Sequence, residues 1–202
     1  MLLVLLCMAL CFPAALAESA FDNAALLATE NMDVFEHPGT ANTVVRPVNQ
    51  PYLGQADEGY DGELDAYVDY LILPDLEVTL LRIFLSTVTY EPLTAQEMRL
   101  TVGGKQYTFA VEYDQSEYDG IYMEDYAVCL ADASLPLLKA IAQQKKDDPI
   151  PVEFLCDGEV AFSGLILIPG QDAADLYDRF IDLGGKKQSL KAYDDLWPCS
   201  VK

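Results

Sequence analysis

One stretch, residues 126–168, constrains the fold more than any other part of the chain. It reads YAVCLADASLPLLKAIAQQKKDDPIPVEFLCDGEVAFSGLILI. Apolar residues recur at helical spacing over 135–144, between two runs rich in β-branched and aromatic residues. Asp157-Gly158 interrupts the second run with a residue pair that favours a two-residue hairpin turn. The stretch therefore predicts a strand, a helix and a β-hairpin, in that order.

The rest of the chain adds strands before this stretch and a helix after it. β-Branched and aromatic residues predict further strands over residues 64–73, 76–90, 98–102 and 106–111. Arg82 is the one charge in the second of these runs, so we expect it to reach an edge or to pair with an acid. An amphipathic pattern over 172–183, ended by Gly184-Gly185, predicts the second helix.

These elements predict an α+β fold. Because the strands run together and the helices come late, we expect about seven strands in a mostly antiparallel sheet or open sandwich. The helix of 135–144 is expected to pack across the sheet, with the second helix near the C-terminus. The predicted organisation is a signal peptide at 1–17, an irregular N-terminal leader at 18–60, a single α+β domain at 61–185 and a C-terminal tail at 186–202.

The first 17 residues carry the pattern of an export signal. They read MLLVLLCMALCFPAALA, an apolar run that ends in the small residues of a signal-peptidase site, Ala15-Leu16-Ala17. An uncleaved membrane anchor is the alternative, but Pro13 breaks a run that is already shorter than the roughly 20 residues of a membrane span. We therefore expect a secreted or cell-envelope protein.

The net charge of −21 limits the partners. A surface this acidic repels phosphate backbones, which argues against nucleic-acid binding. It leaves a solvated acidic surface, cation binding, or recognition of a basic protein. Catalytic constellations are also missing: His37 is the one histidine, and no G-x-S-x-G elbow or P-loop is present. We name no catalytic residues and expect a protein that is not an enzyme.

The segment 112–125, EYDQSEYDGIYMED, alternates acids with tyrosines and is predicted to be an exposed loop. Tyrosine offers a flat apolar face with a polar tip, which suits recognition of carbohydrate or of a basic protein surface. The candidate binding residues are Tyr113, Asp114, Glu117, Tyr118, Asp119 and Tyr122. Two carboxylates of this segment could instead serve a carbohydrate hydrolase. A loop that only keeps the protein soluble is the third interpretation.

A second acidic cluster raises the question of calcium. Its candidate ligands are Asp57, Asp61, Glu63 and Asp65. Val68 stands where a hand-type calcium loop needs a bidentate glutamate, so only an irregular calcium site or a solvated loop fits. Cys129 and Cys156 lie on the two strands that flank the first helix, where they could form a disulfide or serve as apolar core residues.

Four segments follow one another in an order that has a known parallel. They are MRLTVGGKQYTF, DYAVCLADASLPLLKAIAQQ, PVEFLCDGEVAFSGLIL and DAADLYDRFIDLGG. The order resembles small exported domains of unassigned function in anaerobic bacteria, over roughly residues 64–185. The resemblance implies a bacterial exported protein with a hairpin, a helix, a second hairpin and a final helix, and it carries no catalytic residues. Our first hypothesis is a non-catalytic binding domain; a carbohydrate hydrolase and a calcium-stabilised structural domain are the alternatives.

Overall fold

The computed structural model describes residues 21–36, 40–144, 148–188, 190–196 and 198–202. The predicted signal peptide and His37 lie outside these ranges. Three α-helices are present in them: α1 (Asn23–Leu27), α2 (Pro136–Ala142) and α3 (Gly170–Asp182). The strands are β1 (Met32–Glu36), β2 (Thr43–Pro47), β3 (Tyr52–Ala56), β4 (Gly62–Leu73), β5 (Val78–Thr89), β6 (Glu97–Val102), β7 (Lys105–Ala110), β8 (Glu112–Tyr118), β9 (Ile121–Leu130), β10 (Ile150–Cys156), β11 (Glu159–Ile166) and β12 (Cys199–Val201).

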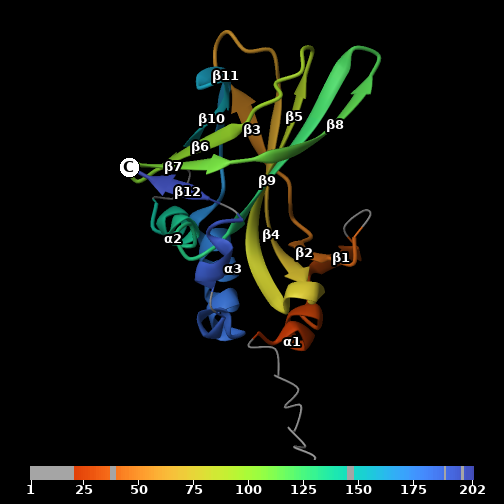
Figure 1. Ribbon diagram of the computed structural model, residues 1–202, viewed down its shortest axis with the longest axis vertical. Coiled ribbons are helices and arrows are strands. Elements are labelled where there is room, and N and C mark those ends of the chain that lie inside the picture. Colours follow the sequence, from red (N-terminus) through yellow and green to blue (C-terminus); the bar gives the residue numbers. More distant parts are fainter. Residues whose placement is uncertain (1–20, 37–39, 145–147, 189, 197) are drawn as a thin grey trace, which may run out of the picture.

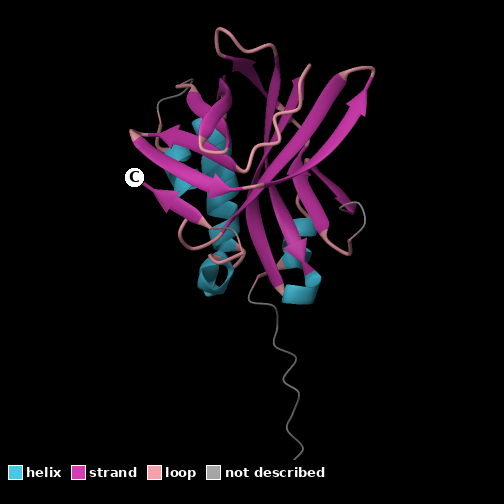
Figure 2. Ribbon diagram, turned by 45° about the horizontal axis from the view of Figure 1, so that its top comes forward, coloured by secondary structure: helices cyan, strands magenta, loops and turns pink. Residues whose placement is uncertain are grey.

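All of these strands belong to one antiparallel sheet that curls into a half-barrel (Figure 1). The order across it is β12-β7-β6-β10-β11-β3-β4-β5-β9-β8. β2 pairs with the C-terminal part of β4, at residues 70–72, and its other edge pairs with β1. The helices α2 and α3 lie side by side against one face of the curl (Figure 2).

The predicted α+β class with about seven strands is therefore wrong, because the described residues form a mostly β fold of twelve strands. The strands expected from the sequence are all present, as β4 to β7 and β9 to β11. The difference comes from β1, β2, β3, β8 and β12, which occupy segments that we expected to be irregular. These added strands shift the balance from α+β to a sheet with three helices.

Short strands in the expected leader and tail explain part of this correction. β1, β2 and β3 have five residues each, too few for a clear period-2 pattern, and prolines stand beside them in the sequence. They are ordered by pairing: β3 lies between β11 and β4, and β2 pairs with β4. The tail likewise supplies β12, which pairs with β7.

The acidic segment 112–125 is a hairpin rather than the predicted loop. β8 and β9 pair through it, and Asp119-Gly120 forms the turn with φ values of 54° and 77°. This is the same kind of turn pair that we recognised at Asp157-Gly158, where φ is 52° and 83°. The recognition, hydrolase and solubility interpretations of this segment all assumed a loop, because the turn pair Asp119-Gly120 was not recognised.

The curl of the sheet depends on close backbone approach where β11, β3 and β4 meet. A Cβ atom added to Gly164 would lie 2.6 Å from the carbonyl oxygen of Gln55, and one added to Gly54 would lie 2.7 Å from that of Leu64. Glycine is therefore required at this corner. The corner brings the two halves of the sheet around a common core, in which the rings of Tyr126 and Phe154 meet at 4.8 Å between centroids.

Candidate functional site

The strands β4, β5 and β9 separate two faces of different chemistry. The inner face carries apolar side chains, such as Ile83 and Val128, and packs toward the core. Asp69, Arg82 and Cys129 are opposite one another in the register of the three strands and belong to the outer face. All three are buried, although they lie on the side away from α3.

A buried ion-pair network lies at the centre of the outer face, and we call it the Arg–Asp–Arg triad: Arg46, Asp69 and Arg82. The guanidinium of Arg82 donates to both carboxylate oxygens of Asp69, from Nε at 2.8 Å and from Nη2 at 2.9 Å. Arg46 on β2 donates to Oδ2 of the same carboxylate, from Nη2 at 2.9 Å and Nε at 3.2 Å. One carboxylate therefore neutralises only one of two guanidinium groups.

Aromatic rings and burial shape the electrostatics of the triad. The guanidinium carbon of Arg46 lies 4.1 Å from the ring centroid of Tyr67, and that of Arg82 lies 5.2 Å from that of Phe84. Burial alone would lower the pKa of Arg82, but its hydrogen bonds to Asp69 and the charge of that carboxylate raise it above its ordinary value. Arg82 therefore stays charged at every physiological pH.

Beside the triad, two adjoining hollows form what we call the outer groove. The larger has a volume of about 590 Å³ and the smaller about 400 Å³. They share the side chains of Arg82, Phe84, Asp114 and Asp125. The smaller hollow adds Phe35, Arg46, Tyr67 and Ser86. The larger adds apolar residues, namely Leu71, Leu73, Leu76, Val111, Leu196 and Pro198. The groove therefore has one half with charged and aromatic side chains, two arginines and two aspartates among them, and one apolar half.

Two carboxylates in the shared part of the groove, Asp114 and Asp125, form what we call the acidic pair. They are direct cross-strand partners on β8 and β9. Like charges directly opposite each other destabilise a sheet. The ion pairs found among the described residues all involve other acids, namely Asp69 and Glu153. The charge of Asp125 instead acts at longer range, where it contributes to the raised pKa values of Arg82 and Tyr67.

The structure divides the six binding residues predicted from the sequence. Tyr113 and Asp114, at the start of β8, line the outer groove. The other four lie toward the tip of the hairpin, where Glu117 faces Tyr122 across the strands and Tyr118 is 83% exposed. Asp119 lies in the turn itself. These four residues do not line the groove, but they extend the acidic, tyrosine-rich surface along the same strand.

Glu124, another acid of this segment, has a structural role. Its carboxylate is fully buried and accepts from the backbone N–H groups of Leu93 and Thr94 at 2.9 and 3.1 Å. It also accepts from Nε2 of Gln115 at 2.6 Å and from the hydroxyl of Tyr126 at 2.8 Å. These bonds fix β8 to β9 and hold the connection between β5 and β6 against them.

The four predicted calcium ligands are not brought together. The carboxylate of Asp57 accepts from the hydroxyl of Ser163 at 2.6 Å, while Glu63 and Asp65 lie along β4. Burial, and secondly the charge of Glu63, raises the pKa of Asp65. Within the described ranges, no three His, Cys, Asp or Glu side chains are grouped as ligands of one metal ion. Calcium binding by these four residues stays a prediction.

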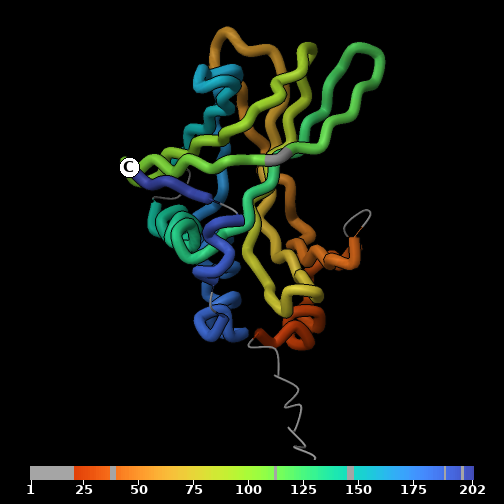
Figure 3. The backbone as a smooth tube through the Cα atoms, in the orientation of Figure 1, coloured from red at the N-terminus to blue at the C-terminus, as the bar shows by residue number. Residues whose placement is uncertain are grey.

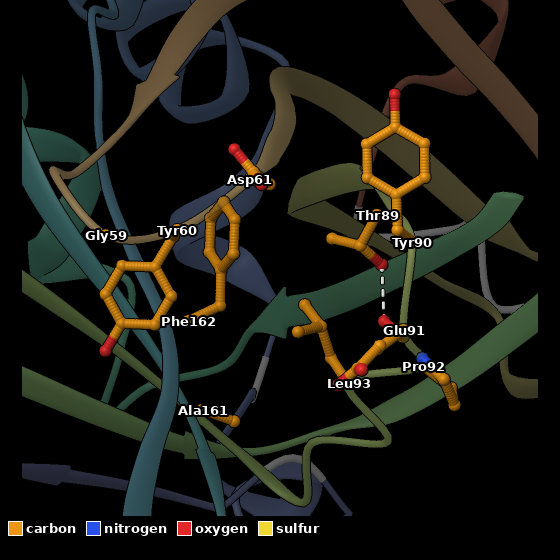
Figure 4. A pocket seen from close by; sticks show the side chains of 10 residues that line it. All are labelled: Gly59, Tyr60, Asp61, Thr89, Tyr90, Glu91, Pro92, Leu93, Ala161 and Phe162. Atoms are coloured by element: carbon orange, nitrogen blue, oxygen red, sulfur yellow. Dashed lines mark hydrogen bonds between the residues drawn. The ribbon is translucent and has the colours of Figure 1, made fainter.

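Asp61 lines a separate hollow of about 390 Å³ beyond the ends of β3 and β5 (Figure 4). Tyr60 packs on Phe162 there, with ring centroids 5.5 Å apart, and Tyr90 stands at the rim with 68% of its surface exposed. Phe162 is only 1% exposed, so its ring serves the core rather than a ligand. We therefore place the candidate site in the outer groove.

The two cysteines considered for a disulfide are both free thiols in the structure. Cys129 lines the outer groove, whereas Cys156 lies at the end of β10 and accepts a weak bond from Nε2 of Gln96 at 3.7 Å. Burial raises the pKa of the Cys129 thiol to about 12, and the nearby guanidinium of Arg82 only partly offsets this effect. Cys129 is thus a protonated, apolar wall of the groove.

Sequence reasoning missed most of the groove. Arg82 had one signal, a lone charge in an apolar strand, and the expected acidic partner is Asp69 on the neighbouring strand. Arg46 gave no signal because it lies in the supposed leader, and Tyr67 and Phe84 read as ordinary strand residues. Asp125 was noted only as one acid among several. A hairpin assignment at Asp119-Gly120 would have placed it opposite Asp114.

Comparison of the chain with protein-family models, with curated proteins and with solved structures found no match. None of the helices in the described part of the chain has the length and hydropathy that a bilayer span requires. The function proposed below therefore depends on the geometry and charge of the outer groove.

Proposed function

We propose that this protein is an exported, non-catalytic recognition domain that binds a basic polypeptide segment in the outer groove. The apolar run at residues 1–17, with its small residues before Glu18, supports export. The acidic pair is the observation that carries the choice of ligand, because Asp114 and Asp125 face each other with no cation bound to either among the described residues. A lysine or arginine of a partner relieves that repulsion.

The shape of the groove supports a polypeptide rather than a single cation. Its apolar half, with Leu71 and Leu196, adjoins the charged and aromatic half, so a ligand that carries a cation and apolar side chains fills both. The net charge of −21 further favours the approach of basic partners and increases their rate of association.

The aromatic rings of the site favour this ligand over a sugar. A sugar stacks on an open aromatic face, but the face of Tyr67 is occupied by the guanidinium of Arg46 at 4.1 Å. Phe84 has the guanidinium groups of Arg46 and Arg82 within 5.6 and 5.2 Å of its ring centroid. The rings therefore serve to hold the two arginines and leave the carboxylates as the accessible polar groups.

The test measures binding of a fluorescein-labelled peptide in which lysine alternates with valine and threonine, by fluorescence anisotropy. Asp114→Asn with Asp125→Asn is expected to weaken binding about tenfold, because each of the two lost charge contacts contributes about 0.7 kcal/mol and about 1.4 kcal/mol corresponds to a factor of ten. The matched control is Asp178→Asn with Asp182→Asn, which removes the same charge from α3 and leaves the groove intact. Equal losses in the two double variants would refute recognition in the groove.

Carbohydrate hydrolysis is a second candidate, supported by the same acidic pair. Residues directly opposite in a sheet have Cβ atoms about 4.5–5.5 Å apart, and retaining glycosidases hold their two carboxyl groups about 5–5.5 Å apart. Turnover of a panel of aryl glycosides by the wild-type chain, abolished by Asp114→Asn or by Asp125→Asn, would establish this activity in place of simple recognition. No turnover together with peptide binding would reject it.

A further inference from the structure

β8 is an open edge of the sheet. It follows β9 at the end of the strand order, and no described strand pairs with its other side. The hairpin that it forms with β9 stands apart from the helices, as the green tube of Figure 3 shows. At the opposite end the sheet closes with β12, which has only three residues, whereas β8 has seven. Alternate N–H and C=O groups along β8 therefore point away from β9 without a strand to receive them.

Natural sheets protect such edges with charges, and β8 carries acids on both of its faces. Asp114 lies on the face of the outer groove, and Glu117 lies on the other, opposite Tyr122. Two copies of this strand placed edge to edge would bring acids against acids, which opposes self-pairing. The same charges favour an incoming strand that carries lysine or arginine.

The edge is also held in its extended form before any partner arrives. Tyr113 packs on Tyr126 with ring centroids 5.5 Å apart, and Gln115 donates to the buried carboxylate of Glu124 at 2.6 Å. Both contacts lie on the inner face of the hairpin, so they fix the strand without using its free edge. Because β8 is already ordered, this protein loses little conformational entropy when a partner binds.

We propose that β8 receives the basic segment as an added β-strand, so that main-chain hydrogen bonds along Glu112–Tyr118 extend the sheet. The inference rests on the proposed function and specifies its mode. An added strand beside β8 places every second side chain on the face of the outer groove, directly beside Asp114 and two strand spacings, about 10 Å, from Asp125 on β9. A lysine or arginine there is long enough to extend over β8 toward Asp125. The expected partner is an extended segment with lysine or arginine at alternate positions and no proline.

The experiment compares the lysine-alternating peptide with a version N-methylated at every second residue. Methylation removes the N–H donors on one edge of the peptide and leaves its charge unchanged. Two methylated peptides are used, one methylated at the odd positions and the other at the even positions. Between them they block either edge of the peptide, whichever one faces β8. At least one is expected to bind about tenfold more weakly than the parent, and parent binding is expected to slow amide hydrogen exchange within β8 about tenfold or more.

The outcomes separate this inference from the proposed function. If both methylated peptides bind as well as the parent, while Asp114→Asn with Asp125→Asn weakens all three, recognition in the groove stands and strand addition is wrong. If the parent binds without slowing exchange in β8, strand addition is again wrong. If no peptide binds the wild-type chain, the proposed function and the inference fall together. Weaker binding of one methylated peptide with protection of β8 supports both.

Discussion

The inner and outer faces of β4, β5 and β9 share the same strands but are stabilised in opposite ways. On the inner face, side chains such as Leu81, Ile83 and Leu85 are completely buried and need no specific partner. On the outer face, Asp69 is equally buried, but it depends on four hydrogen bonds from two arginines. Apolar core positions tolerate exchange for residues of similar volume. Removing one partner of a buried charge instead destabilises the fold strongly, because the remaining charge is left buried and unpaired.

This difference indicates what each face is for. A buried ion-pair network is weak evidence for stability, because apolar residues of similar volume often stabilise a fold as well or better. The triad holds Arg46 and Arg82 in the floor of the outer groove, where the negative charge of Asp125 acts on Arg82. The inner face therefore serves folding, and the outer face is the one on which we propose recognition.

The largest expected effect comes from Asp69→Ala. It leaves two buried guanidinium groups without their carboxylate and should lower the free energy of unfolding by about 3–5 kcal/mol, as measured by urea denaturation. The matched control is Glu153→Ala, which removes the acid of the more exposed pair with Arg99 at 2.8 Å. That change should cost less than about 1 kcal/mol. Similar losses at the two positions would contradict the special status of the triad.

Alkaline titration tests a second group of the outer face. The pKa of Cys129 is about 12 in the fold against an ordinary value of 9.0, so the folded state holds its proton more tightly than the unfolded state. Its stabilising contribution is complete below pH 9 and is lost as the pH rises toward 12, by on the order of 1.4 kcal/mol per pH unit. The loss of stability with pH should therefore be shallower in Cys129→Ala, since tyrosines titrate equally in both proteins. If the free energy of unfolding fell equally with pH in both proteins, burial would not raise the pKa of the Cys129 thiol.

Replacing the whole triad separates stability from recognition. Arg46→Met, Asp69→Leu and Arg82→Met combined should leave the free energy of unfolding unchanged or raise it by about 1–4 kcal/mol, as for other buried networks exchanged for apolar groups. Binding of the lysine-alternating peptide should strengthen, because the floor of the groove loses two guanidinium charges and only one carboxylate while the acidic pair is kept. A combined variant that unfolds more easily than the wild-type chain would show instead that the triad stabilises the fold.

The smallest expected effect concerns the inner face. Ile83→Val removes one methylene from a fully buried side chain and should cost about 0.5–1.5 kcal/mol by urea denaturation. Peptide binding should stay at the wild-type value, since the side chain points away from the groove. A change in affinity at constant stability would mean that the two faces are coupled through the strand.

How far the sequence predicts this molecule depends on how local each signal is. The Asp157-Gly158 turn, the helix of 135–144 and the long run of β5 were predicted because the pattern and the turn chemistry lie within a few residues. β2 and β3 were not, because five-residue strands are stabilised by partners far along the chain, as Tyr52 is by Ala66. The triad joins Arg46 to Asp69 and Arg82, which are 23 and 36 positions away in the sequence. A pattern within a few residues cannot predict such a long-range contact.

The position of β3 also limits the order in which the sheet can assemble during folding. This five-residue strand, formed near the start of the chain, separates β4 from β11, whose residues come about a hundred positions later. Until Glu159–Ile166 is available, β3 has one side without its neighbour, and the two halves of the sheet cannot be joined. A chain synthesised from its N-terminus therefore emerges from the ribosome with its seam still open, and shortening it at either end of that seam would expose two sheet edges to aggregation.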